Sequence, residues 1–207
     1  MRFFDERNNP APTGAVDRFI RRFPAVSYGM AVLVVYVVAA SALGLALVPS
    51  LLLAGALVPP LWALDSWLRW PALGLLGGAM PFTWGFTLLV VVPLYNLVLP
   101  TRLRPFAGGY FTLAAVPWYL HNALFYLVRF TFLPFVTMTP FGVIFLRAMG
   151  MRVGRRVRIS SEHFSDPCLI TLGDDVVIGG SATVYCHHGG AGHLVIAPVV
   201  IGDRATI

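Results

Sequence analysis

Three of the five histidines of this chain lie in one short segment near its end. Residues 185–193 read Tyr-Cys-His-His-Gly-Gly-Ala-Gly-His. A histidine side chain gains or loses a proton near neutral pH, so it can serve as a general acid or base. His187 and His188 are therefore candidates for proton transfer.

A six-residue repeat flanks this segment and predicts what positions it. A fixed short period indicates one unit stacked on itself, and six residues suit a short strand with a tight corner. Three units would form a coil of about 18 residues with the aliphatic side chains inside, and coils would stack at about 4.8 Å. The repeated aliphatic positions are Val153 and Ile159, then Leu172, Ile178 and Val184, then Val195, Ile201 and Ile207.

These repeats carry a resemblance to a known family. Residues 172–184, Leu-Gly-Asp-Asp-Val-Val-Ile-Gly-Gly-Ser-Ala-Thr-Val, and residues 201–207, Ile-Gly-Asp-Arg-Ala-Thr-Ile, resemble the hexapeptide-repeat acyltransferases, whose fold is a left-handed parallel β-helix. The match covers roughly residues 150–207. It implies an all-β left-handed β-helix there, of about three coils.

A narrower resemblance extends towards the membrane part of the chain. Thr139-Pro140, Arg147-Ala-Met-Gly150, Val153-Gly-Arg-Arg-Val157 and residues 166–174, Asp-Pro-Cys-Leu-Ile-Thr-Leu-Gly-Asp, are similar to the membrane-embedded terminal region of polylysine-synthetase-type non-ribosomal peptide synthetases. After His187 the Gly-Gly-Ala-Gly loop departs from that pattern. It looks more like the loop of small sugar or xenobiotic acetyltransferases.

The resemblance implies a reaction and a set of site residues. In the acyltransferases a histidine on a loop leaving the β-helix is the general base, and His187 lies nearest that position, with His188 second. The acyl or aminoacyl group would come from coenzyme A or a phosphopantetheinyl carrier protein, with no tightly bound cofactor, and pass to a hydroxyl or amine. The predicted substrate-binding residues are Tyr185, Gly189, Gly190, Gly192 and His193.

Two alternatives remain open at this point. The repeat could be a degenerate scaffold that tethers a larger synthetase to the membrane without catalysis. It could also resemble the β-helical carbonic anhydrases, which bind zinc with histidines between subunits. His188 and His193 would then need a third ligand such as His163, because catalytic zinc takes three protein ligands. Our primary prediction has no metal.

The composition divides the chain into two parts. It is 57% hydrophobic and 12% charged, against about 25% charged residues in ordinary soluble domains. No charge lies between Arg22 and Asp65, or between Arg69 and Arg102, and these gaps exceed the roughly 20 residues that cross a bilayer. Charges return after Arg147. The sequence therefore predicts a membrane part followed by a water-soluble part.

The positions of the basic residues indicate which side of the membrane each end of an apolar segment faces. All of them are arginine, the net charge is +6, and they cluster at 18–22, 102–104 and 147–158, beside apolar segments. This is typical of the cytoplasmic flanks of membrane helices and does not favour nucleic-acid binding. We predict a multi-pass cell-membrane protein in contact with the bilayer, with its repeat domain on the cytoplasmic side.

Individual membrane segments follow from the same pattern. Residues 28–48 and 74–98 are long enough to span, and 51–66 form a shorter apolar element. We expect 108–137 to lie in the interface, with His121, Asn122 and Arg129 facing headgroups, rather than to cross with these residues as an internal site. A short helix from Phe141 to Met149 is predicted to bury Leu146 and Met149, expose Arg147 and stop at Gly150.

Three regions result. Residues 1–24 are a cytoplasmic N-terminal segment, residues 25–149 hold membrane and interfacial helices, and residues 150–207 form the hexapeptide-repeat domain. Because the repeat stops partway through a unit at Ile207, we expect an incomplete β-helix. Its open edge predicts self-association or packing against a tandem domain.

Overall fold

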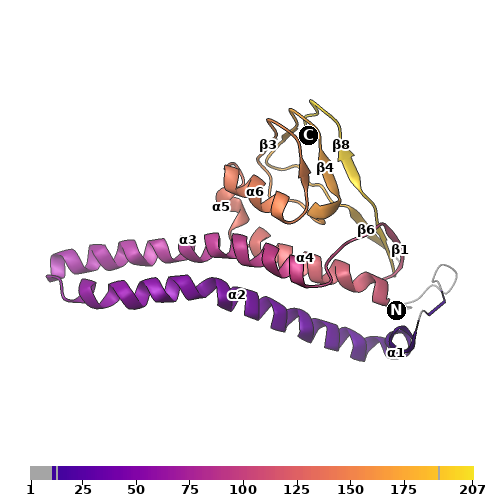
Figure 1. Ribbon diagram of the computed structural model, residues 1–207, viewed down its shortest axis with the longest axis horizontal. Coiled ribbons are helices and arrows are strands. Elements are labelled where there is room, and N and C mark those ends of the chain that lie inside the picture. Colours follow the sequence, from indigo (N-terminus) through magenta and orange to yellow (C-terminus); the bar gives the residue numbers. More distant parts are fainter. Residues whose placement is uncertain (1–10, 13, 191) are drawn as a thin grey trace.

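Long helices come first in the chain and short strands last (Figure 1). The computed structural model describes residues 11–12, 14–190 and 192–207. Residues 1–10 and 13 of the predicted N-terminal segment therefore lie outside the described residues; its described remainder includes α1 (Ala15–Arg22) and the start of the next helix. A helical region followed by a strand region confirms the broad fold prediction.

Two helices form a long hairpin. α2 (Pro24–Trp62) and α3 (Ser66–Val98) are each long and apolar enough to cross a membrane, judged by length and composition. α2 continues through Pro49, so the segments 28–48 and 51–62 belong to one helix rather than two elements. Membrane helices tolerate such prolines because neighbouring groups satisfy the freed carbonyls.

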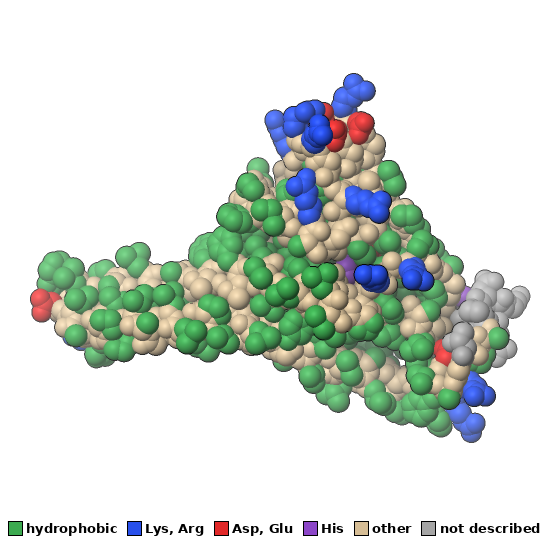
Figure 2. Space-filling model, in the orientation of Figure 1, with side chains coloured by type: hydrophobic (Ala, Val, Ile, Leu, Met, Phe, Trp, Pro, Cys, Tyr) green, Lys and Arg blue, Asp and Glu red, His purple; other side chains and the backbone are tan. Residues whose placement is uncertain are grey.

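Small residues let the two helices approach each other. Ala42, Ala46 and Ser50, spaced four apart on α2, are buried, as in the small-residue interfaces of membrane helices. The Ser50 hydroxyl donates a hydrogen bond to the Met80 carbonyl at 3.0 Å. On the face shown in Figure 2, apolar side chains are spread along the hairpin, with an acidic group at its tip, whereas arginine and acidic residues gather at the far end of the strand region.

Shorter elements connect the hairpin to the strands. They are β1 (Phe106–Gly109), η2 (Leu113–Ala115), α4 (Val116–Arg129), α5 (Leu133–Val136) and α6 (Pro140–Ala148). Leu146 of α6 and Met149, which caps it, are buried and Arg147 is exposed, as the sequence predicts. Gly150 follows with a positive φ of 100°.

The prediction that α4 turns its polar residues to headgroups is wrong. His121, Asn122 and Arg129 are 0%, 5% and 6% exposed. α4 lies between the hairpin and the strand region (Figure 1), so polar groups on it can be paired within the protein.

The strand region contains two parallel sheets and one antiparallel sheet. β2 (Arg152–Val153), β4 (Ile170–Leu172) and β8 (Val199–Ile201) pair in parallel, as do β3 (Arg158–Ile159) and β5 (Val177–Ile178). β6 (His187–Gly190) and β7 (His193–Ile196) form an antiparallel hairpin, and β1 pairs with the outer edge of β7. The predicted glycine loop is thus largely two strands.

The repeat predicts most of the buried aliphatic positions. Leu172, Ile178, Val184 and Ile201 are all at most 8% exposed. Val195 and Ile207 are exceptions at 43% and 50% exposed, and Val153 is half-buried. Val195 lies in β7, whose antiparallel pairing with β1 and β6 buries the neighbours Leu194 and Ile196 instead.

Glycine after the aliphatic residue permits close stacking of the corners. A Cβ at Gly173 would lie 2.7 Å from the Asp203 backbone nitrogen. The corners are also linked by carboxylates, because Asp174 accepts from the Arg155 N–H at 2.7 Å and Asp203 accepts from the Asp174 N–H at 2.8 Å. These aspartates are corner residues, and Gly173, which precedes Asp174, has no room for a side chain.

We expect Gly173→Ala to lower the free energy of unfolding by about 1–3 kcal/mol, because the added methyl group overpacks the corner. Gly202→Ala is the matched control, since a Cβ there meets nothing within 4 Å, and its effect should stay within about 0.5 kcal/mol. Thermal unfolding of both purified variants in detergent measures the difference. Equal melting temperatures would refute the stacked-corner explanation.

Candidate active site

A buried carboxylate joins α4 to the β6–β7 hairpin. Asp166 is 0% exposed and adopts the left-handed conformation (φ 56°, ψ 49°) just before the short η3 helix (Pro167–Leu169). Asp166 Oδ1 accepts from Asn122 Nδ2 at 2.6 Å, and Oδ2 lies 2.6 Å from His187 Nδ1. Backbone strain of this kind persists where the surroundings fix a residue firmly, often at functional sites.

The contact with Asp166 orients the His187 imidazole. A carboxylate can only accept, so Nδ1 carries the proton and the Nε2 lone pair remains as the basic position. Aromatic side chains hold the ring on two sides. Tyr185 stacks on it at 5.6 Å between centroids and 4° between planes, and Trp118 meets it edge-on at 5.0 Å.

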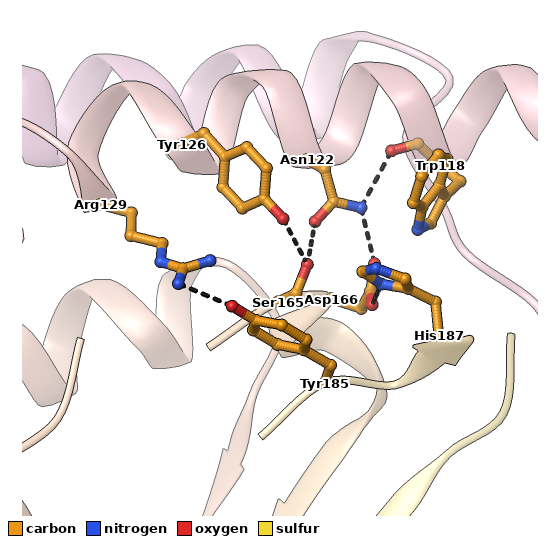
Figure 3. Close-up of polar contacts among 8 residues, drawn as sticks. All are labelled: Trp118, Asn122, Tyr126, Arg129, Ser165, Asp166, Tyr185 and His187. Atoms are coloured by element: carbon orange, nitrogen blue, oxygen red, sulfur yellow. Dashed lines mark hydrogen bonds and ion pairs between the residues drawn. The ribbon is translucent and has the colours of Figure 1, made fainter. Parts of the chain in front are cut away.

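Further hydrogen bonds fix the orientation of Asn122, the α4 residue that donates to the Asp166 carboxylate (Figure 3). Asn122 Nδ2 also donates to the Trp118 carbonyl at 3.1 Å, and Asn122 Oδ1 accepts from the Ser165 hydroxyl at 2.6 Å. Because the Ser165 proton is used in that bond, Tyr126 OH must donate to Ser165 Oγ at 3.0 Å. Asn122 therefore has one orientation, with its amide nitrogen towards Asp166.

A buried guanidinium supports Tyr185. Arg129 donates from a terminal nitrogen to Tyr185 OH at 2.9 Å and lies over the rings of Tyr126, Phe130 and Tyr185. His163 Nδ1 is 3.5 Å from the same nitrogen. Within the described part of the chain, no carboxylate forms an ion pair with Arg129. Its effect on His187 is exerted through the stacked Tyr185 ring.

The structure brings together only some of the predicted site residues. His187 and Tyr185 lie in the cluster around Asp166. His188 is exposed and, as the next residue in β6, faces away from it. His193 begins β7, opposite Gly190 and Gly109. Gly189 packs against Tyr110, whose hydroxyl occupies the space of a Cβ, and Gly192 turns the hairpin with φ 86°.

Four further residues complete the site: Trp118, Asn122, Ser165 and Asp166. Of these four, only Asn122 stood out in the sequence, as a polar residue within an apolar run. Asp166 was visible in the sequence as part of Asp-Pro, without a sign of its role. Their contacts join segments more than 40 residues apart in the chain, as the 43- and 44-residue separations of Ser165 and Asp166 from Asn122 show.

Other nucleophiles and metal ligands are less well placed. Burial raises the pKa of the Cys168 thiol to about 11 and that of Cys186 to about 12, so neither is a thiolate at neutral pH. Both are free. Among the described residues, no three His, Cys, Asp or Glu side chains lie close enough to share a metal ion.

A second buried histidine lies on the same helix. His121 Nδ1 donates to Asn96 Oδ1 at 2.9 Å, and burial lowers its pKa to about 4, an effect that nearby Asp166 partly opposes. A histidine neutral in the fold and protonated when unfolded makes the folded state less stable as the pH falls from about 6.5 towards 4.

This linkage gives a pH prediction. Wild-type protein should lose up to roughly 3 kcal/mol of stability from this group across that range, whereas His121→Gln should show a shallower fall. The exposed His188→Gln is the control and should follow the wild type. Melting temperatures measured at several pH values test this, and parallel curves for wild type and His121→Gln would exclude a neutral buried His121.

Comparisons with known proteins do not assign this site to a family. No protein family, characterised protein or solved structure matches the chain.

Proposed function

We propose that the chain is a membrane-anchored acyltransferase with His187 as its general base. The observation that carries the proposal is the buried Asp166 carboxylate bonded to His187 Nδ1 at 2.6 Å. In this arrangement the carboxylate fixes the tautomer and stabilises the imidazolium that forms during reaction. A hydrogen-bonded His–Asp pair is the expected machinery for activating a weak oxygen or nitrogen nucleophile.

The reaction follows from the position of the free nitrogen. His187 Nε2 takes the proton from an acceptor hydroxyl or amine, whose oxygen or nitrogen attacks the carbonyl carbon of an acyl thioester. The tetrahedral intermediate then expels the thiolate, and His187 returns the proton to the sulfur. The products are an ester or amide and a free thiol. Trp118 Nε1 is buried and has no hydrogen-bond partner among the described residues, so it is a donor available to the carbonyl oxygen.

The strand register supports a β-helical scaffold for this site. Parallel partners are 19 residues apart in β2–β4 and β3–β5, and 20 apart at the Phe164–Val184 bridge. From β4 to β8 the step is 29 residues, as in Ile170 with Val199. The difference of ten equals the length of the hairpin, residues 187–196. A coil of near-constant length with one inserted hairpin is what the family resemblance leads us to expect.

The proposal assigns the remaining partners by the same resemblance. Acyl coenzyme A or a phosphopantetheinyl carrier is the thioester donor. The α2–α3 hairpin is the membrane anchor, with the strand region on the cytoplasmic side. Self-association or tandem packing would cover the open edge of the strands.

Substitution of the base tests the proposal directly. In purified full-length protein supplied with a series of acyl coenzyme A thioesters, His187→Ala should reduce thiol release by about 10²-fold or more, since general-base catalysis contributes 10²–10⁴. His188→Ala, on the opposite face of the strand, should stay within a few-fold of wild type. Retained activity in His187→Ala contradicts the assignment of His187 as the base. Wild-type protein that neither releases thiol nor binds the thioesters would instead make a non-catalytic membrane tether the better description.

A further inference from the structure

A pocket that is partly open to the surface lies beside His187, between the membrane hairpin and α4. It has a volume of about 420 Å³. One wall is α2 between Ser27 and Tyr36, and the other is α4 from Val116 to Tyr126. His187 and Asn122 lie at its edge on the strand side, so the pocket leads from the surface of a membrane helix to the candidate base.

The lining excludes a charged ligand. None of the described residues that line the pocket is an aspartate, glutamate, lysine or arginine, and aliphatic and aromatic side chains dominate. Burial and the neighbouring Tyr110 and Tyr28 raise the pKa of Tyr119 to about 12, which reflects an environment that disfavours negative charge. The phosphates of coenzyme A or of a carrier arm would therefore remain outside, and the pocket suits an uncharged chain.

Access from the bilayer follows from the length of α2. With 39 residues it is about 58 Å long, nearly twice the roughly 30 Å hydrocarbon core, and ordinary tilts do not absorb the excess. The tip of the hairpin carries Trp62, Trp67 and Trp70 with Asp65 and Arg69, which suits one membrane interface. The pocket wall at the other end of α2 therefore extends towards the opposite interface.

The outer side of this wall is apolar as well. Met30, Leu33 and Val34 are 54–64% exposed, so the helix presents hydrocarbon to its surroundings along the length of the pocket. From Tyr28 to Tyr36 the wall covers about 12 Å. Tyr36 lies about 39 Å along α2 from Trp62, so the pocket begins near the opposite interface, and the apolar surface of α2 connects it to the hydrocarbon core.

We infer that this pocket binds the hydrocarbon chain of a lipid-like substrate and places its polar reactive end at His187. This deepens the proposed function, on which it rests. The chain could belong to the acyl group of the donor or to a lipid alcohol that accepts it. Both sources share the same chemistry, an uncharged chain with one reactive polar end.

Tryptophan quenching by brominated chains tests the assignment without requiring catalysis. Trp118 lines the pocket, so a variant in which Trp62, Trp67, Trp70 and Trp84 are replaced by Phe reports from there alone. Purified in detergent, it should show saturable quenching by a chain-brominated dodecanol, by the corresponding dodecanoyl coenzyme A, or by both. Affinity should rise about fourfold per added methylene until the pocket is filled.

Matched variants separate the pocket from general detergent effects. Ala123→Phe on the α4 wall should abolish saturable quenching. Ala31→Phe, on the opposite wall and exposed in the fold, should do the same if the first variant fails to fold. Ala40→Phe adds the same ring to an exposed position of α2 outside the pocket and should change nothing.

The two probes distinguish the sources. Quenching by the alcohol alone assigns the chain to the acceptor, and quenching by the thioester alone assigns it to the donor. Quenching that is absent, independent of chain length, or unchanged in Ala123→Phe and Ala31→Phe overturns the inference. Binding without acyl transfer would reject the proposed function and keep the pocket, whereas acyl transfer without quenching would reject the pocket alone.

Discussion

A carboxylate with no exposure to solvent is the constraint on which the site depends. Burying an unpaired charge is costly, so Asp166 must find partners wherever the fold places it. Asn122 supplies one from α4 and His187 supplies the other from β6. These two bonds tie the helical region to the strand region and orient the imidazole. Loss of either partner would leave a buried charge incompletely satisfied, which explains why Asn122 is itself held by Ser165 and the Trp118 carbonyl.

The helical hairpin has an apolar surface and the strand region has a charged end, and α4 lies between the two. The hairpin exposes apolar side chains along its length, while the strand region carries its arginines and aspartates at the far end. α4 lies between them and is polar on the side that faces the strands. The same helix lines the pocket beside His187. A reaction between a membrane-dissolved chain and a water-soluble thioester would require such a boundary.

Much of the fold follows from local patterns in the sequence. Leu172, Ile178 and Ile201 are buried as the six-residue period predicts, because each parallel strand repeats the environment of the one beside it. The prediction that Val195 is buried is wrong because an antiparallel hairpin interrupts that period. The pairing of Val195 with β1 depends on residues about 90 positions earlier. Residues 28–48 and 51–66 were expected to be separate elements, whereas α2 runs continuously through Pro49 as far as Trp62.

The site was less predictable than the fold. The sequence drew attention to His187, since a histidine in a break of the repeat is unusual, but gave no sign that Asp166 would be its partner. Asn122 and Arg129 were placed towards headgroups because the polar residues of a helix lying in the membrane interface face the headgroups. Their burial depends on the strand region covering α4, which is a tertiary contact that periodicity does not encode.

The central claim is that Asp166 holds His187 as the Nδ1–H tautomer, with Nε2 available as the base. Nitrogen NMR of ¹⁵N-histidine-labelled protein, with the His187 signals assigned by His187→Gln, measures this tautomer directly. Neutral His187 should show a protonated Nδ1 and an unprotonated Nε2, and Asp166→Asn should remove that preference. A neutral His187 protonated on Nε2, or a spectrum unchanged by Asp166→Asn, would contradict the account.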